Sequence, residues 1–384
     1  MSEANKTTRR EFVKDGAMAA AGVAAAAAAA HAAPAGVPAK VAPAGMPAKA
    51  APAAQQPTSK ILNYNANMEY RPWGKTGLMV SAVCMGGHWK RIDKALGSDN
   101  GAKNWLAANL DDPAFQKNRY EVLSRCMEVG INYIDACTIQ EVTAYSRALK
   151  GRRDKMYLGC SWYQKEMRSA GCRTEKALLE TLDWGMKECG LDYVDLWRIT
   201  MHEQSDKHTE AEVEEMMKAL RAAKKSGKVR FTGFSSHNRN HIKWMIEKYP
   251  DVVDSFCTPY TAKTKELPTD SIFETVRKYQ VGVFGIKPFA GNSLFAGDST
   301  LTSPSAAEDD QKARLTIRYI LCNTALTAPI PGLINTHQVD NVAKAVQEAR
   351  QLDKTEKAAL DKAMDEAWAR LPSDYQWLKD WEYV

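Results

Sequence analysis

Short apolar runs alternate with longer segments of helical periodicity along the body of the chain. Eight apolar runs predict β-strands, at residues 81–85, 132–135, 156–161, 194–199, 229–235, 254–257, 282–286 and 326–330. The intervening segments predict helices at residues 113–129, 140–150, 174–189, 208–226, 238–248, 270–279, 310–322 and 337–352. A strand and then a helix, eight times over, predicts the α/β fold called the (β/α)8 TIM barrel.

Two segments flank this repeat. Residues 68–80 carry two glycines in a polar turn between apolar stretches, which predicts an N-terminal β-hairpin that plugs the bottom of the barrel. Residues 360–384 carry three tryptophans and predict a C-terminal helical extension packed over the barrel. The alternative fold is a doubly wound open sheet, but no G-x-G-x-x-G motif follows the first strand.

The first 60 residues differ in composition from the rest. Arg9-Arg10, followed by Phe12, Lys14 and an alanine-rich stretch, resembles a twin-arginine (Tat) export signal, and we assign residues 1–32 to it. That stretch is too weakly apolar to span a bilayer, so we expect no stable membrane insertion. Residues 33–60 repeat proline and alanine and predict a disordered linker, which leaves residues 61–384 for the barrel. The expected partner is the Tat export machinery, and the expected location is periplasmic or extracytoplasmic.

Composition and charge exclude several classes of protein. With 45% apolar and 26% charged residues, the chain can bury a large core. Most of its net charge of +6 lies before residue 61, so the near-neutral body predicts no nucleic-acid partner. The eight cysteines show no C-x-x-C spacing and no metal-ligand spacing to histidine, so we expect no metal site.

Five motifs appear in order along the body. They are residues 68–81 (MEYRPWGKTGLMVS), 130–136 (GINYIDA), 190–196 (GLDYVDL), 227–236 (GKVRFTGFSS) and 330–332 (IPG). Together they resemble the opening hairpin, the second, fourth and fifth strands, and the end of the eighth strand of the aldo-keto reductases. The resemblance implies a small-molecule oxidoreductase that binds NADP or NAD in an extended pose across the C-terminal rim of the barrel. Hydride then passes between the nicotinamide and a carbonyl carbon.

The resemblance breaks at the catalytic residues. In this family a Tyr, assisted by Asp, Lys and His, donates the proton to the forming alkoxide. Only Asp135 matches, because the Tyr, Lys and His positions fall on Gln140, Ser161 and Thr200. A Gln amide can hydrogen-bond to an oxyanion but cannot act as an acid near neutral pH. Three roles stay open for Asp135: an unpaired acid facing the barrel interior, a structural cap, or a redeployed base.

His202 is the main candidate to replace the missing acid. It shares strand parity with Thr200, so both side chains point into the barrel mouth if the strand continues that far. The competing interpretation is a loop histidine hydrogen-bonded to Glu203 or to the backbone. His88 and Trp89, which follow the first strand, are further candidates for the pocket lining.

The resemblance also implies a set of cofactor-binding residues. Ser235, Ser236 and Cys257 occupy the positions that hold the carboxamide, and Ile286 occupies that of the aromatic residue on which the nicotinamide stacks. The pyrophosphate loop and the adenine segment correspond to Lys287, Pro288, Phe289, Gly291, Gly332, His337, Asp340 and Asn341. Because His337 stands where an Arg is usual, the preference between NADP and NAD stays open.

Three functions fit these observations. The first is an exported NAD(P)(H)-dependent oxidoreductase that acts on a sugar or a small aldehyde or ketone with an atypical proton donor. The second is a non-catalytic barrel that binds a nucleotide or another small ligand. The third is a barrel whose rim performs lyase or isomerase chemistry, because sites of this fold reside on its loops. The oligomeric state is not predicted.

Overall fold

A ring of parallel strands forms the centre of the protein. The computed structural model describes residues 60–101 and 109–384. Its eight-stranded sheet has the order β10-β9-β8-β7-β6-β5-β4-β3, and each neighbouring pair is parallel. The strands are β3 (Met85–Gly86), β4 (Tyr133–Ala136), β5 (Tyr157–Cys160), β6 (Val194–Thr200), β7 (Val229–Ser235), β8 (Ser255–Pro259), β9 (Gly282–Ile286) and β10 (Ala328–Pro329).

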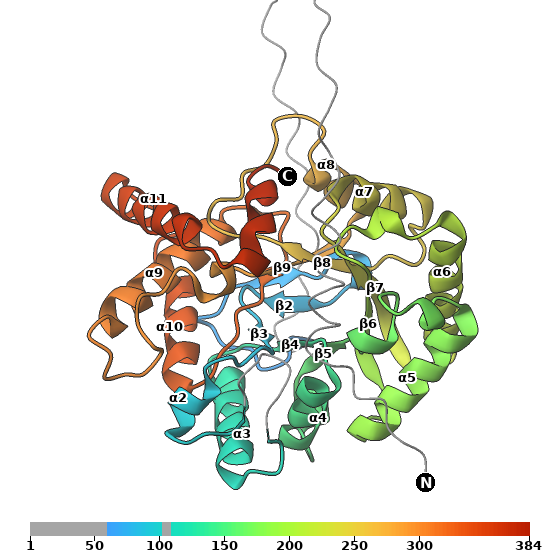
Figure 1. Cartoon of the computed structure of the whole chain (residues 1–384), viewed down its shortest axis with the longest axis horizontal. Helices are drawn as coiled ribbons and strands as arrows, with labels where there is room; N and C mark the ends of the chain where they lie inside the picture. Colours follow the sequence, from blue (N-terminus) through green and yellow to red (C-terminus); the bar gives the residue numbers. More distant parts are fainter. Residues whose placement is uncertain (1–59, 102–108) are drawn as a thin grey trace, which may run out of the picture. The chain divides into compact units, whose positions relative to one another are not determined.

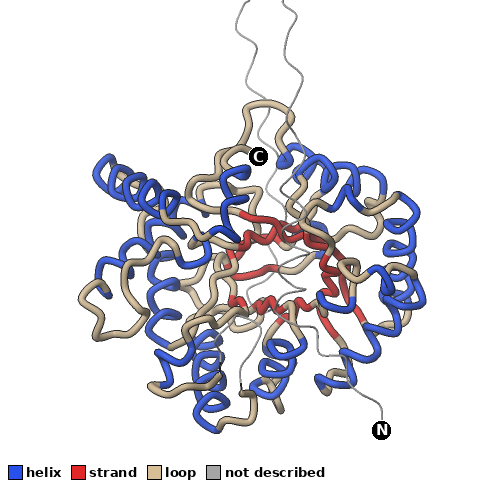
Figure 2. Tube along the Cα trace, viewed as in Figure 1, coloured by secondary structure: helices blue, strands red, loops and turns tan. Residues whose placement is uncertain are grey.

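Backbone hydrogen bonds close this sheet into a barrel. Gly86 and Gly332 form a parallel bridge, and the Gly86 amide donates to the Pro331 carbonyl at 2.8 Å. The Cys84 amide donates to the Pro329 carbonyl at 3.1 Å, so the segment before β3 lies beside β10. The strands therefore form a ring inside a layer of helices (Figure 2). The predicted (β/α)8 barrel is confirmed.

Helices surround the ring (Figure 1). They are α3 (Pro113–Glu128), α4 (Ile139–Ala148), α5 (Glu175–Cys189), α6 (Glu210–Lys225), α7 (Arg239–Lys248), α8 (Ile272–Tyr279), α9 (Ala306–Leu321) and α10 (Thr336–Gln347). Side-chain caps fix many of their starts; at α6, Thr209 and Glu212 form a capping box. A short helix α2 (Ile92–Leu96), which the sequence did not predict, lies in the loop after β3.

The predicted hairpin is present and fills the end of the barrel where the strands begin. β1 (Tyr70–Pro72) pairs antiparallel with β2 (Met79–Ser81) across a short 3-10 turn, Gly74–Thr76. From this turn Trp73, which is fully buried, packs edge-on against Tyr133 and Phe284 inside the ring, at centroid distances of 5.2 and 5.7 Å. Because residues 79–81 pair in the hairpin, the first barrel strand begins at Met85 rather than at the predicted residue 81.

The C-terminal extension consists of α11 (Lys354–Ala369) and the 3-10 helix η8 (Ser373–Trp381). α10 ends at Gln347, before the predicted residue 352, because Glu348 adopts an extended backbone and a new capping box at Asp353 and Glu356 starts α11. Within the described ranges, no helix is long and apolar enough to cross a membrane. The predicted export signal (1–32) and most of the predicted linker (33–60) lie outside the described residues.

Candidate active site

A cavity of about 400 Å³ opens at the carboxyl ends of the barrel strands. Its wall includes the ends of β4, β6, β7 and β9, the loops that follow β3 and β9, the start of α10 and part of η8. Of the predicted site residues, the lining includes Asp135, Thr200, Ser235, Ile286, Lys287, Pro288, Phe289, Gly291, Gly332, His337 and Asn341. It does not include Gln140, Ser161, His202, Ser236, Cys257 or Asp340.

Asp135 is paired with a cation. Its carboxylate receives the Arg198 guanidinium, with Nη2 to Oδ1 at 2.6 Å and Nε to Oδ2 at 3.1 Å. Arg198 comes from β6, and both side chains are almost completely buried. Tyr133 donates its hydroxyl to Asp135 Oδ2 at 3.1 Å. The hypothesis of an unpaired Asp135 is therefore wrong, because a cation from β6 neutralises it.

Ser161 and Thr200 lie together at the ends of β5 and β6. Their hydroxyl oxygens are 2.8 Å apart, but only Thr200 reaches the cavity. Beneath them the buried carboxylate of Glu166 accepts the Thr200 amide at 2.7 Å, the Trp162 amide at 3.0 Å and the Trp197 indole N–H at 3.0 Å. Burial raises the pKa of Glu166 to about 7, against the effect of these three donors. Glu166 thus fixes the ends of both strands.

His202 does not occupy the barrel mouth. β6 ends at Thr200, so the strand alternation that predicted an inward His202 stops two residues too early. The His202 Nδ1 atom instead accepts the Gln204 amide at 3.0 Å, and over a third of the side chain is exposed. The expectation of an inward-facing His202 is wrong, and the loop interpretation agrees with the geometry. Gln140, on α4, also lies outside the cavity lining.

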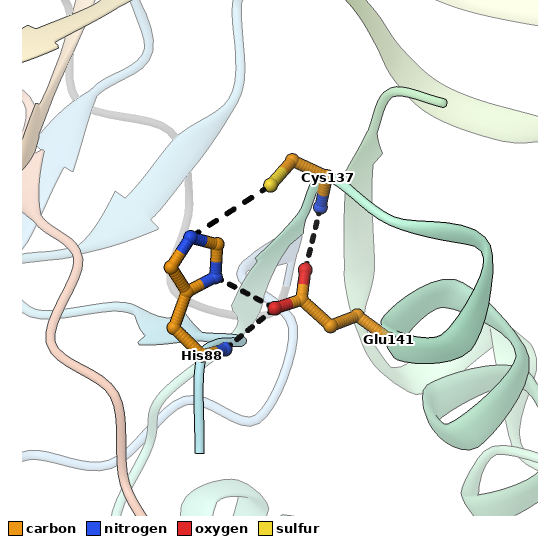
Figure 3. A group of neighbouring side chains, drawn as sticks. All are labelled: His88, Cys137 and Glu141. Carbon is orange, nitrogen blue, oxygen red and sulfur yellow. Dashed lines mark hydrogen bonds and ion pairs between the residues drawn. The ribbon is translucent and has the colours of Figure 1, made fainter. Parts of the chain in front are cut away.

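A different histidine faces the cavity. His88 follows β3, and its Nδ1 lies 2.6 Å from Oε1 of Glu141 on α4 (Figure 3). The same oxygen accepts the His88 amide at 2.6 Å, and Glu141 Oε2 accepts the Cys137 amide at 2.8 Å. On the other side of the ring, His88 Nε2 lies 3.9 Å from the Cys137 sulfur. All three residues line the cavity.

The backbone next to His88 leaves space for the Glu141 carboxylate. A Cβ atom on Gly87 would lie 2.3 Å from the Glu141 carboxyl carbon, so only glycine leaves room for that carboxylate. His88 itself has a φ of 62°, in the left-handed region that side chains with a Cβ rarely adopt. The hydrogen bond from its amide to Glu141 holds this conformation, which is typical of functional sites.

The charges of this group follow from its contacts. Burial would raise the pKa of Glu141, but the charge of His88 and hydrogen bonds from the His88 ring and from the His88 and Cys137 amides lower it. Glu141 is therefore a carboxylate. Burial and the Glu141 charge raise the pKa of the Cys137 thiol well above its ordinary value, so the resting thiol keeps its proton.

The polar atoms of His88, Cys137 and Glu141 all lie within 4.8 Å of one another, a spacing that a metal ion could bridge. However, both Glu141 oxygens already accept hydrogen bonds, and His88 Nδ1 is bonded to one of them. A zinc site would have to displace these hydrogen bonds, and structural and catalytic zinc sites use three or four protein ligands. The donor set therefore favours an oriented histidine over a metal ligand.

Two lysines of the cavity wall supply positive charge. Lys90 and Lys287 both lie against the Tyr375 ring, with Nζ 4.9 and 5.4 Å from its centroid. Burial alone would raise the pKa of Tyr375, but these two ammonium groups lower it below its ordinary value. No carboxylate of residues 60–101 and 109–384 forms an ion pair with either lysine. Gly291, with a φ of 64°, lets Tyr375 approach, because a Cβ there would lie 2.6 Å from the ring.

The residues predicted to hold the carboxamide lie in three different environments. Ser235, at the end of β7, faces the cavity. The Ser236 hydroxyl is buried, 2.6 Å from that of Ser205, and it also accepts the Asn238 amide. Cys257 is buried in the barrel interior, with its sulfur 3.8 Å from Asp135 Oδ2. Ser236 and Cys257 are therefore not positioned to contact the carboxamide directly, because their polar atoms are already bonded to neighbouring residues.

The start of α10 forms the far end of the cavity. Here His337 Nε2 lies 2.6 Å from Asp310 Oδ2, and Asn341 accepts from Arg314 and donates to the Asp310 carbonyl. Asp340 points away from the cavity, toward Arg125 on α3, and the two form an ion pair at 2.6 Å. The prediction of Asp340 as an adenine contact therefore fails, since the helix turns its side chain outward.

Comparisons with known proteins agree with this geometry. The sequence profile of the aldo/keto reductase family matches residues 104–365. The chain belongs to the aldo/keto reductase family.

Individual relatives are distant. L-glyceraldehyde 3-phosphate reductase of Escherichia coli (strain K12) is 24% identical over 246 residues, which cover 59% of this chain and 63% of that protein. The match thus spans less than two thirds of that relative. The holo form of an aldo-keto reductase from Bacillus halodurans superimposes with a TM-score of 0.53 at 20% identity, covering 77% of this chain and 96% of that one. An aldo/keto reductase from Brucella melitensis gives 0.52 at 17% identity, covering 77% and 99%. These structures support the fold.

Sequence reasoning missed several residues of the aldo/keto reductase cavity, among them Arg198, Glu141, Cys137, Tyr375 and Lys90. Arg198 did carry a signal, because it shares strand parity with Thr200 inside an apolar run. Glu141 looked like part of a capping box, three residues after Thr138. Its carboxylate bonds to His88 instead, a contact that only the closed barrel creates.

Proposed function

We propose that this protein is an exported NAD(P)(H)-dependent oxidoreductase that interconverts a carbonyl and an alcohol, with His88 as the proton donor. The observation that carries the proposal is one continuous cavity. Its wall includes the oriented His88–Glu141 pair, the two lysines Lys90 and Lys287, and the start of α10. Such a cavity can hold an extended ligand with an anionic middle and a reactive end.

The charged end fits the phosphates of a dinucleotide. Lys90 and Lys287 supply positive charge that carboxylates of the described residues do not neutralise, and the first turn of α10 adds backbone amides and a favourable dipole. At the nicotinamide end only Ser235 of the predicted polar contacts lines the cavity. The ion pair between His337 and Asp310 gives no preference for a 2′-phosphate, so both NADP and NAD are candidates.

The proton chemistry belongs to His88. When bound, the nicotinamide supplies or accepts the hydride. His88 lines the cavity and can donate a proton to a carbonyl oxygen held there, while Glu141 fixes the orientation of the ring through Nδ1. Thr200 Oγ1, fixed by Ser161 and Glu166, offers a second hydrogen-bond donor at the same rim.

We propose a substrate class from the name of one relative. One relative carries the name L-glyceraldehyde 3-phosphate reductase, which supports a small hydroxyaldehyde or sugar as substrate. Export through the Tat machinery carries a folded protein, so we propose that the cofactor is loaded before export. This part of the proposal rests on the paired arginines of the N-terminal segment.

The test combines binding with turnover. NADPH and NADH are titrated into the purified protein while protein fluorescence is followed, and a panel of small aldehydes and sugars is then assayed for nucleotide oxidation. The proposal predicts saturable binding of at least one nucleotide and turnover of at least one carbonyl. Absence of nucleotide binding would overturn it. Binding without turnover of any carbonyl would favour the non-catalytic ligand-binding barrel instead.

A further inference from the structure

We propose that Cys137, His88 and Glu141 form a thiol triad that adds reversibly to an aldehyde substrate, so that the substrate is held as a thiohemiacetal at the cavity wall. This inference rests on the proposed function for its substrate class. It assigns a covalent role to a cysteine that the proton-transfer scheme does not use.

The three side chains have the order of a nucleophile, a base and an orienting acid. Cys137 Sγ lies 3.9 Å from His88 Nε2, and His88 Nδ1 lies 2.6 Å from Glu141 Oε1, as Figure 3 shows. In nucleophilic triads the acid fixes the ring so that its other nitrogen faces the nucleophile. The sulfur–nitrogen distance is longer than an ideal hydrogen bond, a common feature of ligand-free sites.

Glu141 positions the other two residues of the triad. The carboxylate accepts the amides of His88 and Cys137, so a single buried group positions the base and the nucleophile together. Gly87 leaves the space that this carboxylate fills. The arrangement therefore comes from two segments, after β3 and after β4, that meet only because β3 and β4 are neighbours in the ring.

Cys137 differs from the other cysteines in its surroundings. It alone among the cysteines of the described residues lines the cavity. Cys84, Cys126, Cys160, Cys189 and Cys257 are buried, and Cys172 and Cys322 lie elsewhere on the surface. A buried cysteine inside a core acts as a small apolar side chain. Cys137 instead lies beside a histidine in the cavity, and this histidine can take the thiol proton during attack, which offsets the raised pKa of the resting thiol.

The chemical step needs no additional reagent. The Cys137 sulfur attacks the aldehyde carbon, a C–S bond forms, and the electron pair of the C=O π bond moves to oxygen. His88 Nε2 takes the thiol proton and passes it to that oxygen, which gives a neutral thiohemiacetal. Because the resting thiol is protonated, proton transfer to His88 accompanies the attack.

The first experiment measures protection of the thiol. The purified protein is treated with iodoacetamide, with and without glyceraldehyde, and alkylation at each cysteine is followed by peptide mass mapping. Exposed Cys322 serves as an internal control. At an aldehyde concentration ten times its dissociation constant, alkylation of Cys137 should slow about tenfold, while that of Cys322 stays unchanged. Equal alkylation of Cys137 with and without aldehyde would overturn the proposal.

The second experiment observes the adduct itself. Glyceraldehyde labelled with carbon-13 at C1 should give a protein-bound resonance distinct from the free hydrated aldehyde. That signal should be absent from Cys137→Ala and present in the matched control Cys172→Ala. In His88→Asn, the development of protection should slow by about 100-fold. A signal that persists in Cys137→Ala would refute covalent capture by this residue.

Two further results separate the competing explanations. Stoichiometric binding of added Zn²⁺ that protects Cys137 and is lost in Cys137→Ala would overturn the triad in favour of a metal site. NADPH titration and turnover of the wild-type protein, measured beside the adduct signal, separate this inference from the proposed function. An adduct without nucleotide binding would support the triad and refute the proposed oxidoreductase function. Nucleotide binding and turnover without an adduct would refute the triad and support the oxidoreductase function.

Discussion

Arg198 places its guanidinium 2.6 Å from Asp135 inside the barrel, and so supplies a cation to this buried carboxylate. The two side chains come from β6 and β4 and are almost completely buried. A buried carboxylate needs such a partner, because an isolated charge in the barrel interior would be very costly. The pair holds the strands beneath the cavity in register and leaves proton transfer to other residues.

Removing one partner of this pair should destabilise the fold strongly. Arg198→Met leaves Asp135 as an uncompensated buried charge, and Asp135→Leu does the same to Arg198, each at a cost of about 3–5 kcal/mol. The double variant should lose much less than the sum of the two single changes. Urea unfolding of the four proteins measures the coupling, and simple additivity would contradict the paired arrangement.

Glu166 should make stability depend on pH. Its pKa in the folded protein is about 7 against an ordinary value of 4.5, so its contribution is complete below about pH 4.5 and is lost as the pH rises through 7. The neutral Glu166→Gln variant lacks this loss. Between pH 4.5 and 8 the difference in unfolding free energy should shift by about 3 kcal/mol in favour of the variant. A pH-independent difference would show that Glu166 titrates normally.

His88 and His202 offer a direct comparison of two candidate proton donors. His88 faces the cavity beside Glu141, whereas the His202 ring is bonded to the Gln204 amide. We expect His88→Asn to lower kcat by about 100-fold or more with nucleotide binding unchanged. His202→Ala should keep nearly full turnover. If steady-state assays show instead that His202→Ala loses turnover and His88→Asn keeps it, His202 is the proton donor, as the sequence suggested.

Lys287 should contribute to nucleotide affinity through its charge. Lys287→Ala removes one of the two lysines beside Tyr375 and should weaken NADPH binding about tenfold, or about 1.4 kcal/mol. The effect should shrink at high salt. Lys117→Ala, at an exposed position on α3, is the matched control. Equal NADPH affinity of the wild type, Lys287→Ala and Lys117→Ala would show that the phosphates do not bind beside Lys287.

The sequence predicts the barrel well because apolar runs and helical segments are local patterns. Its errors occur where a strand is short or shared, as at residues 81–85, part of which pairs in the hairpin. The cavity is harder to predict, because its main contacts join distant segments. Asp135 on β4 meets Arg198 on β6 across 63 residues, with β5 between the two strands. His88, after β3, meets Glu141, after the neighbouring β4, across 53 residues. No local motif records such contacts.

The most direct test is to identify what the protein carries after production in a host that exports twin-arginine substrates. The mature chain is purified from a host with a twin-arginine pathway and denatured, and any released small molecule is identified by absorbance and mass; the empty protein is then titrated with NADPH and NADH. We predict a stoichiometric nicotinamide dinucleotide, or tight binding of one that Lys287→Ala weakens. A protein that carries no dinucleotide and binds neither NADPH nor NADH would contradict the oxidoreductase proposal.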